Sequence, residues 1–232
     1  MKNNIDWDHS DELFAQRMPT SVDDRTVEWA QKKAREWFHL LTHYKCAMME
    51  LETRFNLLNE EHMLEYGRAP INSIKTLLKT MQSIKEKMER HGYPLTMDSI
   101  RENLHDIAGV RVICPFPEDV YTLADALLRQ DDITLVRRKD YIETPKENGY
   151  RSLHMIVTVP IYLAHEKRKV KVEVQLRTIA MDFWASLEHQ LRYKNDVEFT
   201  PAMADELYRC AQLSAELDNR MDTLRKSVHR KN

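Results

Sequence analysis

The feature that most constrains this chain is a stretch without glycine or proline, which runs from Ser21 to Tyr66. Apolar residues recur along it in steps of four and three, the spacing of a heptad seam. They are Ala30, Ala34, Trp37, Leu41, Tyr44, Met48, Leu51, Phe55 and Leu58. Ser21 can cap the start, with Asp24 three residues later. The pattern predicts one long helix or a tight helical hairpin.

The middle of the chain differs, because short β-rich runs alternate with helical ones. The expected strands are Ile71–Leu78, Ile107–Cys114, Ile133–Arg138, Ser152–Pro160 and Val170–Leu176. The expected helices are Gln82–His91, Pro117–Arg129 and Thr178–Tyr193. From Thr200 onward, helical spacing returns at Leu207, Leu217, Met221, Leu224 and Val228.

These elements predict an α+β (mixed α/β) fold, with a central mixed sheet of about five strands flanked by helices. Long N- and C-terminal helical extensions complete it. We expect the N-terminal extension at residues 1–66, the sheet domain at residues 67–195 and the C-terminal helix at residues 196–232.

Composition narrows the classes of function. The formal net charge of −2 lacks the basic surplus of proteins that hold long nucleic acids, so no stable nucleic-acid complex is expected. Cys46, Cys114 and Cys210 are odd in number and far apart, which favours a reducing cytoplasm over a disulfide framework. The N-terminus has no apolar signal core, and no apolar run is long enough to span a bilayer. We therefore expect a cytoplasmic protein without a membrane segment.

Strand alternation gathers polar side chains on one face of the expected sheet, since successive residues point to opposite faces. In the last strand Val170, Val172, Val174 and Leu176 share one face, opposite Lys169, Lys171, Glu173, Gln175 and Arg177. Arg111 and His154 lie opposite the apolar residues of their own strands in the same way. A solvated sheet face explains any one strand. Because three strands offer such side chains together, a binding site explains the pattern about as well as a solvated face does.

The segment from Arg137 to His154 carries a second signal. It has four lysines or arginines before Tyr150, and Asn148-Gly149 is a turn signal that places Tyr150 at a loop edge. An exposed tyrosine beside lysine and asparagine suits a stacked base with phosphates nearby. A hairpin turn with a packing tyrosine explains the same residues.

A basic cluster forms the third signal. Steps of four, four and three place Lys79, Ser83, Lys87 and Arg90 on one helical face. Such a face is commonly just solvated, but it also suits the phosphates of a nucleoside triphosphate.

Missing motifs limit how a nucleotide could be held. With four glycines, the chain has neither G-x-x-x-x-G-K-[ST] nor G-x-G-x-x-G, so side chains have to bind any phosphate. His39 and His43 are one helical turn apart and are expected to be surface or seam residues rather than metal ligands.

Three segments match the motifs of a known family in order. They are HDIAGVRVICPF (His105–Phe116), RKDYIETPKENGYRSLH (Arg138–His154) and VEVQLRTIAMDFWASLEHQLRYK (Val172–Lys194), with a weaker match in LLKTMQSIKEKMER (Leu77–Arg90). Over about Ile71 to Lys194 the chain resembles the RelA/SpoT-type (p)ppGpp synthetase domain, in the small alarmone synthetase form.

The resemblance implies a magnesium-dependent enzyme that moves the β,γ-pyrophosphate of ATP to the 3′-hydroxyl of GDP or GTP and leaves AMP. By motif, Asp106 would bind Mg²⁺, and Glu173 would be the base and a second metal ligand. The ATP site would contain Lys79, Ser83, Lys87, Arg90 and Arg111. The GDP/GTP site would contain Tyr150, Asn148, Lys146, His154, Lys139 and Gln175.

One departure leaves alternatives open. The family pattern places an arginine where this chain has Leu77, so one face of adenine would lose its cation–π partner, worth about 0.5–2 kcal/mol. A catalytically weakened nucleotide sensor is therefore one alternative, although Asp106 and Glu173 are both present. The other is a toxin-type enzyme that pyrophosphorylates the 3′ end of tRNA.

The helical extensions bear on assembly. One small sheet covers only one side of such helices, so Trp37, Tyr44 and Phe55 are expected to form an uncovered apolar patch. Packing of the two extensions on each other and on the sheet within one chain is the alternative. Small synthetases of the family are homotetramers, and a symmetric homo-oligomer, a tetramer, is expected here.

Overall fold

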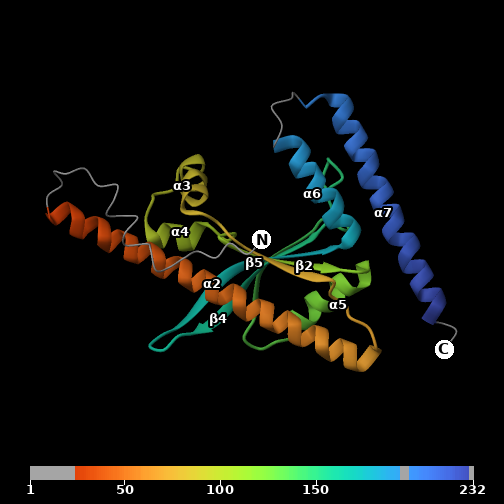
Figure 1. Ribbon diagram of the computed structural model, residues 1–232, viewed down its shortest axis with the longest axis horizontal. Coiled ribbons are helices and arrows are strands. Elements are labelled where there is room, and N and C mark those ends of the chain that lie inside the picture. The colour runs from red at the N-terminus through yellow and green to blue at the C-terminus, as the bar shows by residue number, and fades with distance from the viewer. Residues whose placement is uncertain (1–23, 194–198, 230–232) are drawn as a thin grey trace. The chain divides into compact units, whose positions relative to one another are not determined.

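The computed structural model describes residues 24–193 and 199–229 (Figure 1). The chain divides into two compact units, Met1–Leu40 and Leu41–Asn232. Helix α2 (Asp24–Tyr66) is one continuous helix, so the stretch without glycine or proline does not form a hairpin. The expected cap at Ser21 lies outside the described residues. Everything below concerns the second unit unless stated otherwise, and the domain boundaries expected at 66/67 and 195/196 stay a prediction.

Five strands form one mixed sheet, as expected. They are β1 (Ser73–Leu78), β2 (Ala108–Cys114), β3 (Thr134–Asp140), β4 (Leu153–Tyr162) and β5 (Lys167–Thr178). Their order across the sheet is β1-β2-β5-β4-β3. Only the central β2–β5 pair is parallel, and the other three pairs are antiparallel. The strand β3 ends at Asp140 rather than at the expected Arg138, so Lys139 also belongs to the strand.

In the described part of the chain, five further helices alternate with the strands or follow the last of them. They are α3 (Met81–Arg90), α4 (Met97–Asn103), α5 (Pro117–Leu128), α6 (Ile179–Tyr193) and α7 (Pro201–His229). Helix α4 was not expected, because its seven residues are too short to show a helical period. Its start is marked by Thr96, whose hydroxyl accepts a hydrogen bond from the backbone N–H of Ser99.

One face of the sheet forms the core. The alternating residues expected there are almost fully buried, including Val110, Val112, Met155, Val172 and Val174. Helix α5 lies against β2 and β5, the two central strands. Burial of such a face is the main favourable term in folding, at roughly 25 cal/mol per Å² of apolar surface. The opposite face therefore stays available for polar side chains.

The apolar seam of α2 is covered within the chain, which corrects one expectation. Tyr44 is 4% exposed and Phe55 is fully buried, so they do not form an uncovered patch, while Trp37 is half-buried. Two side chains hold the C-terminal part of α2 in place. Arg54 pairs with Asp132 at 2.6 Å, and Asn59 accepts a hydrogen bond from the N–H of Ile71.

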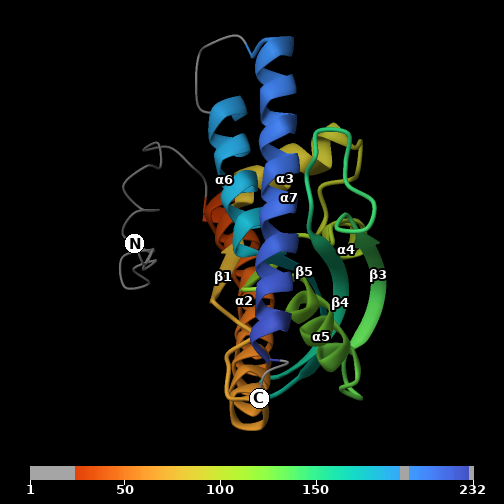
Figure 2. The same cartoon turned by 90° about the vertical axis from the view of Figure 1, so that its right-hand side faces the viewer.

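Helices α6 and α7 run side by side (Figure 1, Figure 2). The indole N–H of Trp184 donates to the carbonyl of Leu207 at 2.8 Å, and the Thr178 hydroxyl donates to Asp218 at 2.6 Å. Apolar residues on the other side of α7 are exposed: Leu213, Leu217, Met221, Leu224 and Val228. Among the described helices, none is long and apolar enough to cross a membrane.

Candidate active site

The register of the sheet brings the polar residues of four strands together. Arg111 on β2 lies opposite Gln175 on β5, which also lies opposite His154 on β4. Lys139 on β3 pairs with His154 in turn. Glu173 is two residues before Gln175, on the same face. The expected polar face is therefore continuous across the sheet.

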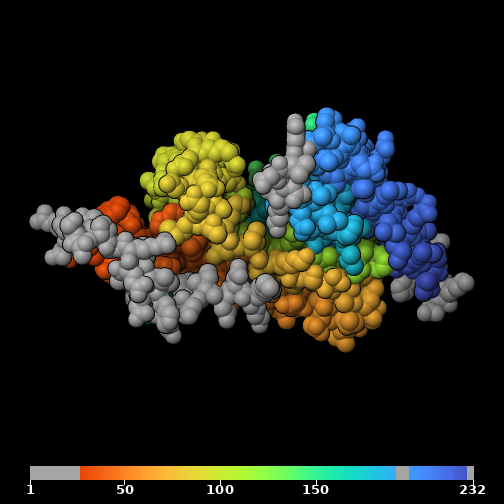
Figure 3. Space-filling view, turned by 45° about the horizontal axis from the view of Figure 1, so that its top comes forward, coloured from red at the N-terminus to blue at the C-terminus, as the bar shows by residue number. Residues whose placement is uncertain are grey.

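Two adjoining cavities lie on this face. One, of about 220 Å³, is lined by Lys139, Tyr141, Lys146 and His154 among others. The second, of about 340 Å³, is lined by Lys87, Tyr93, His105 and Asp106 among others. Arg137, Ile156 and Glu173 line both cavities. In the space-filling view, a hollow separates the surface of α3 from that of α6 (Figure 3).

Asp106 is the charged centre of the second cavity. It lies two residues before β2, and its Oδ2 accepts from Lys79 Nζ at 2.9 Å and from Lys87 Nζ at 2.6 Å. Burial alone would raise the pKa of this carboxyl, but the two lysines outweigh burial and hold the pKa below its ordinary value. The other oxygen, Oδ1, is buried without a hydrogen-bond partner. A buried carboxylate oxygen with an open coordination position suits a hard divalent cation.

Glu173 lies on β5 where the two cavities meet. His154 Nδ1 is 3.3 Å from its Oε1, and the Gln175 amide donates to its Oε2 at 3.0 Å. Burial raises the pKa of the Glu173 carboxyl, but His154 and Gln175 more than offset it, so the pKa lies below its ordinary value. Glu173 is therefore an ionised carboxylate near neutral pH, which both a base and a metal ligand require.

The basic cluster is only partly the helical face that its spacing predicts. Lys79 lies between β1 and α3, outside the helix, because Thr80 caps α3 and accepts from the N–H of Ser83. Lys79 and Lys87 nevertheless converge on Asp106. Ser83 is half-buried beside the cap, and Arg90 is exposed in the last turn and lines neither cavity.

Arg111 on β2 and Leu77 on β1 lie on the same polar face as Glu173, on the side of β5 away from β4. Leu77 on β1 pairs with Gly109, two residues before Arg111, and its side chain is 66% exposed. Arg111 donates to Gln175 Oε1 at 3.3 Å and to Asp182 at 3.4 Å. Arg68 does not replace the missing arginine, because both of its terminal nitrogens bind Asp119.

The turn before Tyr150 is built as the Asn-Gly signal predicts. Gly149 has φ of +85°, its N–H donates to the Lys146 carbonyl at 2.8 Å, and Asn148 Oδ1 accepts from the Tyr150 N–H at 3.1 Å. The Lys146 ammonium lies 4.7 Å from the centre of the Tyr150 ring and 4.8 Å from that of Tyr141. The cation therefore occupies the space between two aromatic rings.

This turn packs tightly against α7. A Cβ added at Gly149 would lie 2.5 Å from the Ala211 Cβ, a distance that real Cβ atoms essentially never show. Tyr150 itself packs on the small cluster of Trp184, Ala185 and Ala211 between α6 and α7. The helical hairpin of α6 and α7 therefore supports the turn.

Several residues of this face were not singled out from the sequence. Arg137 and Tyr141 line the cavities, and Asp182 on α6 pairs with Lys75, Arg111 and Arg177. Arg177 was placed on the polar face by alternation, but it is 4% exposed rather than open. The alternation of polar and apolar residues in β5 indicated the face on which Arg177 lies. No sequence pattern indicated Asp182, which only the tertiary fold brings next to Arg177.

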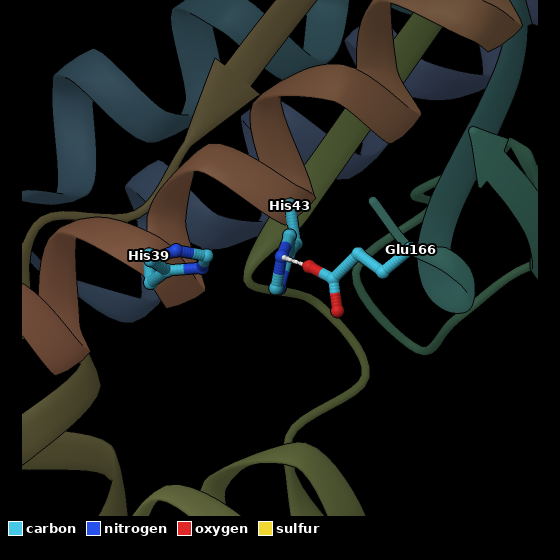
Figure 4. A group of neighbouring side chains, drawn as sticks. All are labelled: His39, His43 and Glu166. Carbon is cyan, nitrogen blue, oxygen red and sulfur yellow. Dashed lines mark hydrogen bonds and ion pairs between the residues drawn. The ribbon is translucent and has the colours of Figure 1, made fainter. Parts of the chain in front are cut away.

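A buried histidine outside this site links α2 to the turn between β4 and β5. His43 is 4% exposed, and its Nε2 is 2.7 Å from Glu166 Oε1. Figure 4 shows this pair together with His39, one turn earlier on α2. His39 is exposed, so the two histidines occupy the expected surface and seam positions. That they are not metal ligands stays a prediction.

Comparison with known proteins supports the resemblance seen in the motifs. Residues 77–198 match the region found in RelA / SpoT proteins. The chain is 42% identical to GTP pyrophosphokinase YwaC of Bacillus subtilis over 193 residues, which are 83% of this chain and 92% of that protein.

Solved structures agree. Small alarmone synthetase 2 from Bacillus subtilis superposes with a TM-score of 0.75 at 41% identity, over 83% of this chain and 99% of that one. Small alarmone synthetase 1 from the same organism, bound to its product pppGpp, gives a TM-score of 0.75 at 34% identity, over 84% and 98%.

Proposed function

The chain belongs to the RelA/SpoT family, and from this premise we propose that it makes the alarmones ppGpp and pppGpp. In the proposed reaction, the 3′-oxygen of GDP or GTP attacks the β-phosphorus of ATP. The bond between that phosphorus and the α,β-bridging oxygen breaks, and AMP leaves. The protein is thus a GTP/GDP pyrophosphokinase.

One observation carries the proposal. Two carboxylates, Asp106 and Glu173, line one cavity together with Lys87 of α3, and the adjoining cavity, which Glu173 also lines, reaches Lys146 in the turn before Tyr150. This arrangement fits two polyanionic nucleotides, ATP and GDP or GTP, that have to meet beside a general base. The 3′-hydroxyl is a poor nucleophile, and Glu173 is the group that takes its proton.

Mg²⁺ is the cofactor we propose for this site. The open Oδ1 of Asp106 and the carboxylate of Glu173 would hold it. A bound Mg²⁺ would offset the charge that develops on the transferred phosphates. Lys79 and Lys87, which bind Asp106 in the free protein, are then available for the phosphates of ATP.

The donor site takes its remaining residues from α3 and the β1–β2 edge. We assign Ser83 and Arg90 to the ATP phosphates and Arg111 to one face of adenine. Leu77 would pack on the other face of the base. Its exposure next to Arg111 supports this assignment, since the two side chains share one face of the sheet.

The acceptor site takes its residues from the Tyr150 turn and from β3, β4 and β5. Tyr150 would stack on guanine, with Asn148 at the edge of the base. Lys146, Lys139 and His154 would bind the acceptor phosphates, and Gln175 would orient Glu173. The lining of the first cavity supports Lys146, Lys139 and His154.

We further propose a homotetramer in the cytoplasm. The support for assembly now comes from the exposed apolar side of α7, where Leu213 and Leu224 are more than half exposed. Three unpaired cysteines support a reducing compartment. Light scattering at micromolar concentration tests the assembly, and the mass of a single 27.6 kDa chain would contradict it.

AMP release from ATP with a panel of acceptors tests the function. We expect AMP to form with GDP or GTP and Mg²⁺. AMP with tRNA alone would indicate the toxin-type reaction. Nucleotide binding without AMP would indicate a sensor, the reading that Leu77 favours.

A further inference from the structure

Arg177 is the most deeply buried charge on the polar face, and the proposed chemistry does not use it. Its side chain is 5% exposed, and its Nη1 lies 3.4 Å from Asp182 Oδ1. One nitrogen, Nη2, donates to the Tyr150 hydroxyl at 2.5 Å and to Gln175 Oε1 at 3.0 Å. A single NH₂ group thus uses both of its protons on two different side chains.

The first of these bonds fixes the direction of a chain of hydrogen bonds. Arginine only donates, so the Tyr150 oxygen accepts from Arg177 and its own proton points to His154 Nε2, 2.8 Å away. Nε2 then accepts, which leaves the proton of the neutral imidazole on Nδ1. Nδ1 faces Glu173 Oε1 at 3.3 Å.

The second bond fixes an amide. Gln175 Oε1 accepts from both Arg177 and Arg111, so its NH₂ group has to point the other way. There it donates to Glu173 Oε2 at 3.0 Å. The two arms that start at Arg177 therefore end on the two different oxygens of one carboxylate.

We propose that Arg177, held by Asp182, is a positioning residue that orients Glu173 through these two arms. One arm includes Tyr150, the side chain proposed to stack on guanine. Binding of guanine and orientation of Glu173 as the general base therefore share one hydrogen-bond network. This inference rests on the proposed function for Glu173. It assigns Arg177 no contact with either nucleotide.

Replacement by lysine separates this role from a merely structural one. In Arg177→Lys the charge opposite Asp182 remains, but one ammonium cannot take the place of the planar fork. We expect kcat to fall by about a hundredfold, the scale of a misplaced catalytic group, while both KM values change only a few-fold. Arg68→Lys is the matched control, because Arg68 also pairs with a buried aspartate, and its kcat should not change. Wild-type kcat in a folded Arg177→Lys would overturn the proposal.

A milder variant keeps the test sharp if the lysine variant does not fold. Tyr150→Phe retains the stacking ring and removes only the hydroxyl that links Arg177 to His154. We expect kcat to fall about tenfold with little change in the acceptor KM, as for one lost hydrogen bond. A raised acceptor KM with unchanged kcat would contradict the network.

The tautomer of His154 tests the network without turnover. Nitrogen-15 NMR of the histidine rings in the free protein, with His154→Gln to assign the signal, should show the Nδ1–H form in the wild type and loss of that preference in Tyr150→Phe. An Nε2–H form in the wild type would overturn the proposal. Absence of AMP formation by the wild type would instead refute the proposed function, so the two failures are distinguishable.

Discussion

The proposed donor and acceptor halves of the site are held together in different ways. Asp106, in the donor half, is satisfied by the ends of two lysine side chains and keeps one oxygen without a partner. Glu173, toward the acceptor half, receives hydrogen bonds from side chains that are themselves fixed by a buried arginine. The acceptor turn also packs directly on α7.

The difference indicates where the site has to rearrange. Lysine ammonium groups are point charges on flexible stems, so Lys79 and Lys87 can move from Asp106 to a phosphate when a bound cation takes their place on the carboxylate. The acceptor half offers a preformed geometry, in which displacement of Lys146 from the Tyr150 ring is the change that a stacking base requires. We therefore expect mutations in the donor half to act mainly through charge and those in the acceptor half through geometry.

The largest effect is expected where the two halves meet. Asp106→Asn and Glu173→Gln each remove a charge from the open face rather than a core contact. AMP formation should fall by on the order of a hundredfold or more in each, with the thermal unfolding midpoint little changed. Near wild-type AMP production by either variant would contradict the assignment of Asp106 and Glu173 as the catalytic pair.

The acceptor half is tested by Tyr150→Ala. Loss of stacking should weaken acceptor binding by about 1–3 kcal/mol, which is about 5- to 150-fold in the acceptor KM. The KM for ATP should change much less. Equal effects on both substrates would mean that Tyr150 supports the turn and does not bind the base.

The preformed geometry of the turn is tested by Gly149→Ala. Positive φ alone costs an alanine about 1–2 kcal/mol, and here the new methyl group also meets Ala211. We expect a lower unfolding midpoint together with a raised acceptor KM. Gly67→Ala is the matched control, because Gly67 has φ of +68° and no neighbour within 4 Å. If the two variants behave alike, contact with α7 does not shape the turn.

The smallest effect is expected in the donor half. Leu77 and Arg111 are diagonal neighbours, whose separation of about 7–8 Å leaves room for one planar base. Leu77→Arg should therefore tighten ATP binding by about 0.5–2 kcal/mol, roughly 2- to 30-fold. Unchanged or weaker ATP affinity, measured by calorimetry, would show that the site has adapted to leucine.

Periodicity predicted most of the fold and the composition of the polar face. Alternation placed Glu173, Gln175, Arg111 and His154 on one face because β2, β4 and β5, the strands that carry them, bury their other face. Alternation does not report order or register, so it could not show that Asp182, on a helix, reaches Arg177. It also left the short α4 undetected.

The same limit explains the wrong expectation for the seam of α2. A heptad pattern shows that apolar residues share a side of a helix, but it does not show what covers them. Tyr44 and Phe55 are buried within the chain, while the similar pattern of α7 leaves Leu217 and Leu224 exposed. Similar spacing thus has opposite outcomes in α2 and α7.

The central parallel pair has a consequence for folding. β2 and β5 are neighbours in the sheet, although α5, β3 and β4 all lie between them along the chain. Pairing of strands so far apart closes a long loop and is slow compared with local hairpins. Asp106 precedes β2 and Glu173 lies on β5, so the two carboxylates meet only when this loop has closed. With these two carboxylates as the proposed catalytic pair, a chain still leaving the ribosome carries Asp106 without its partner and is expected to consume no nucleotide until its synthesis has passed β5.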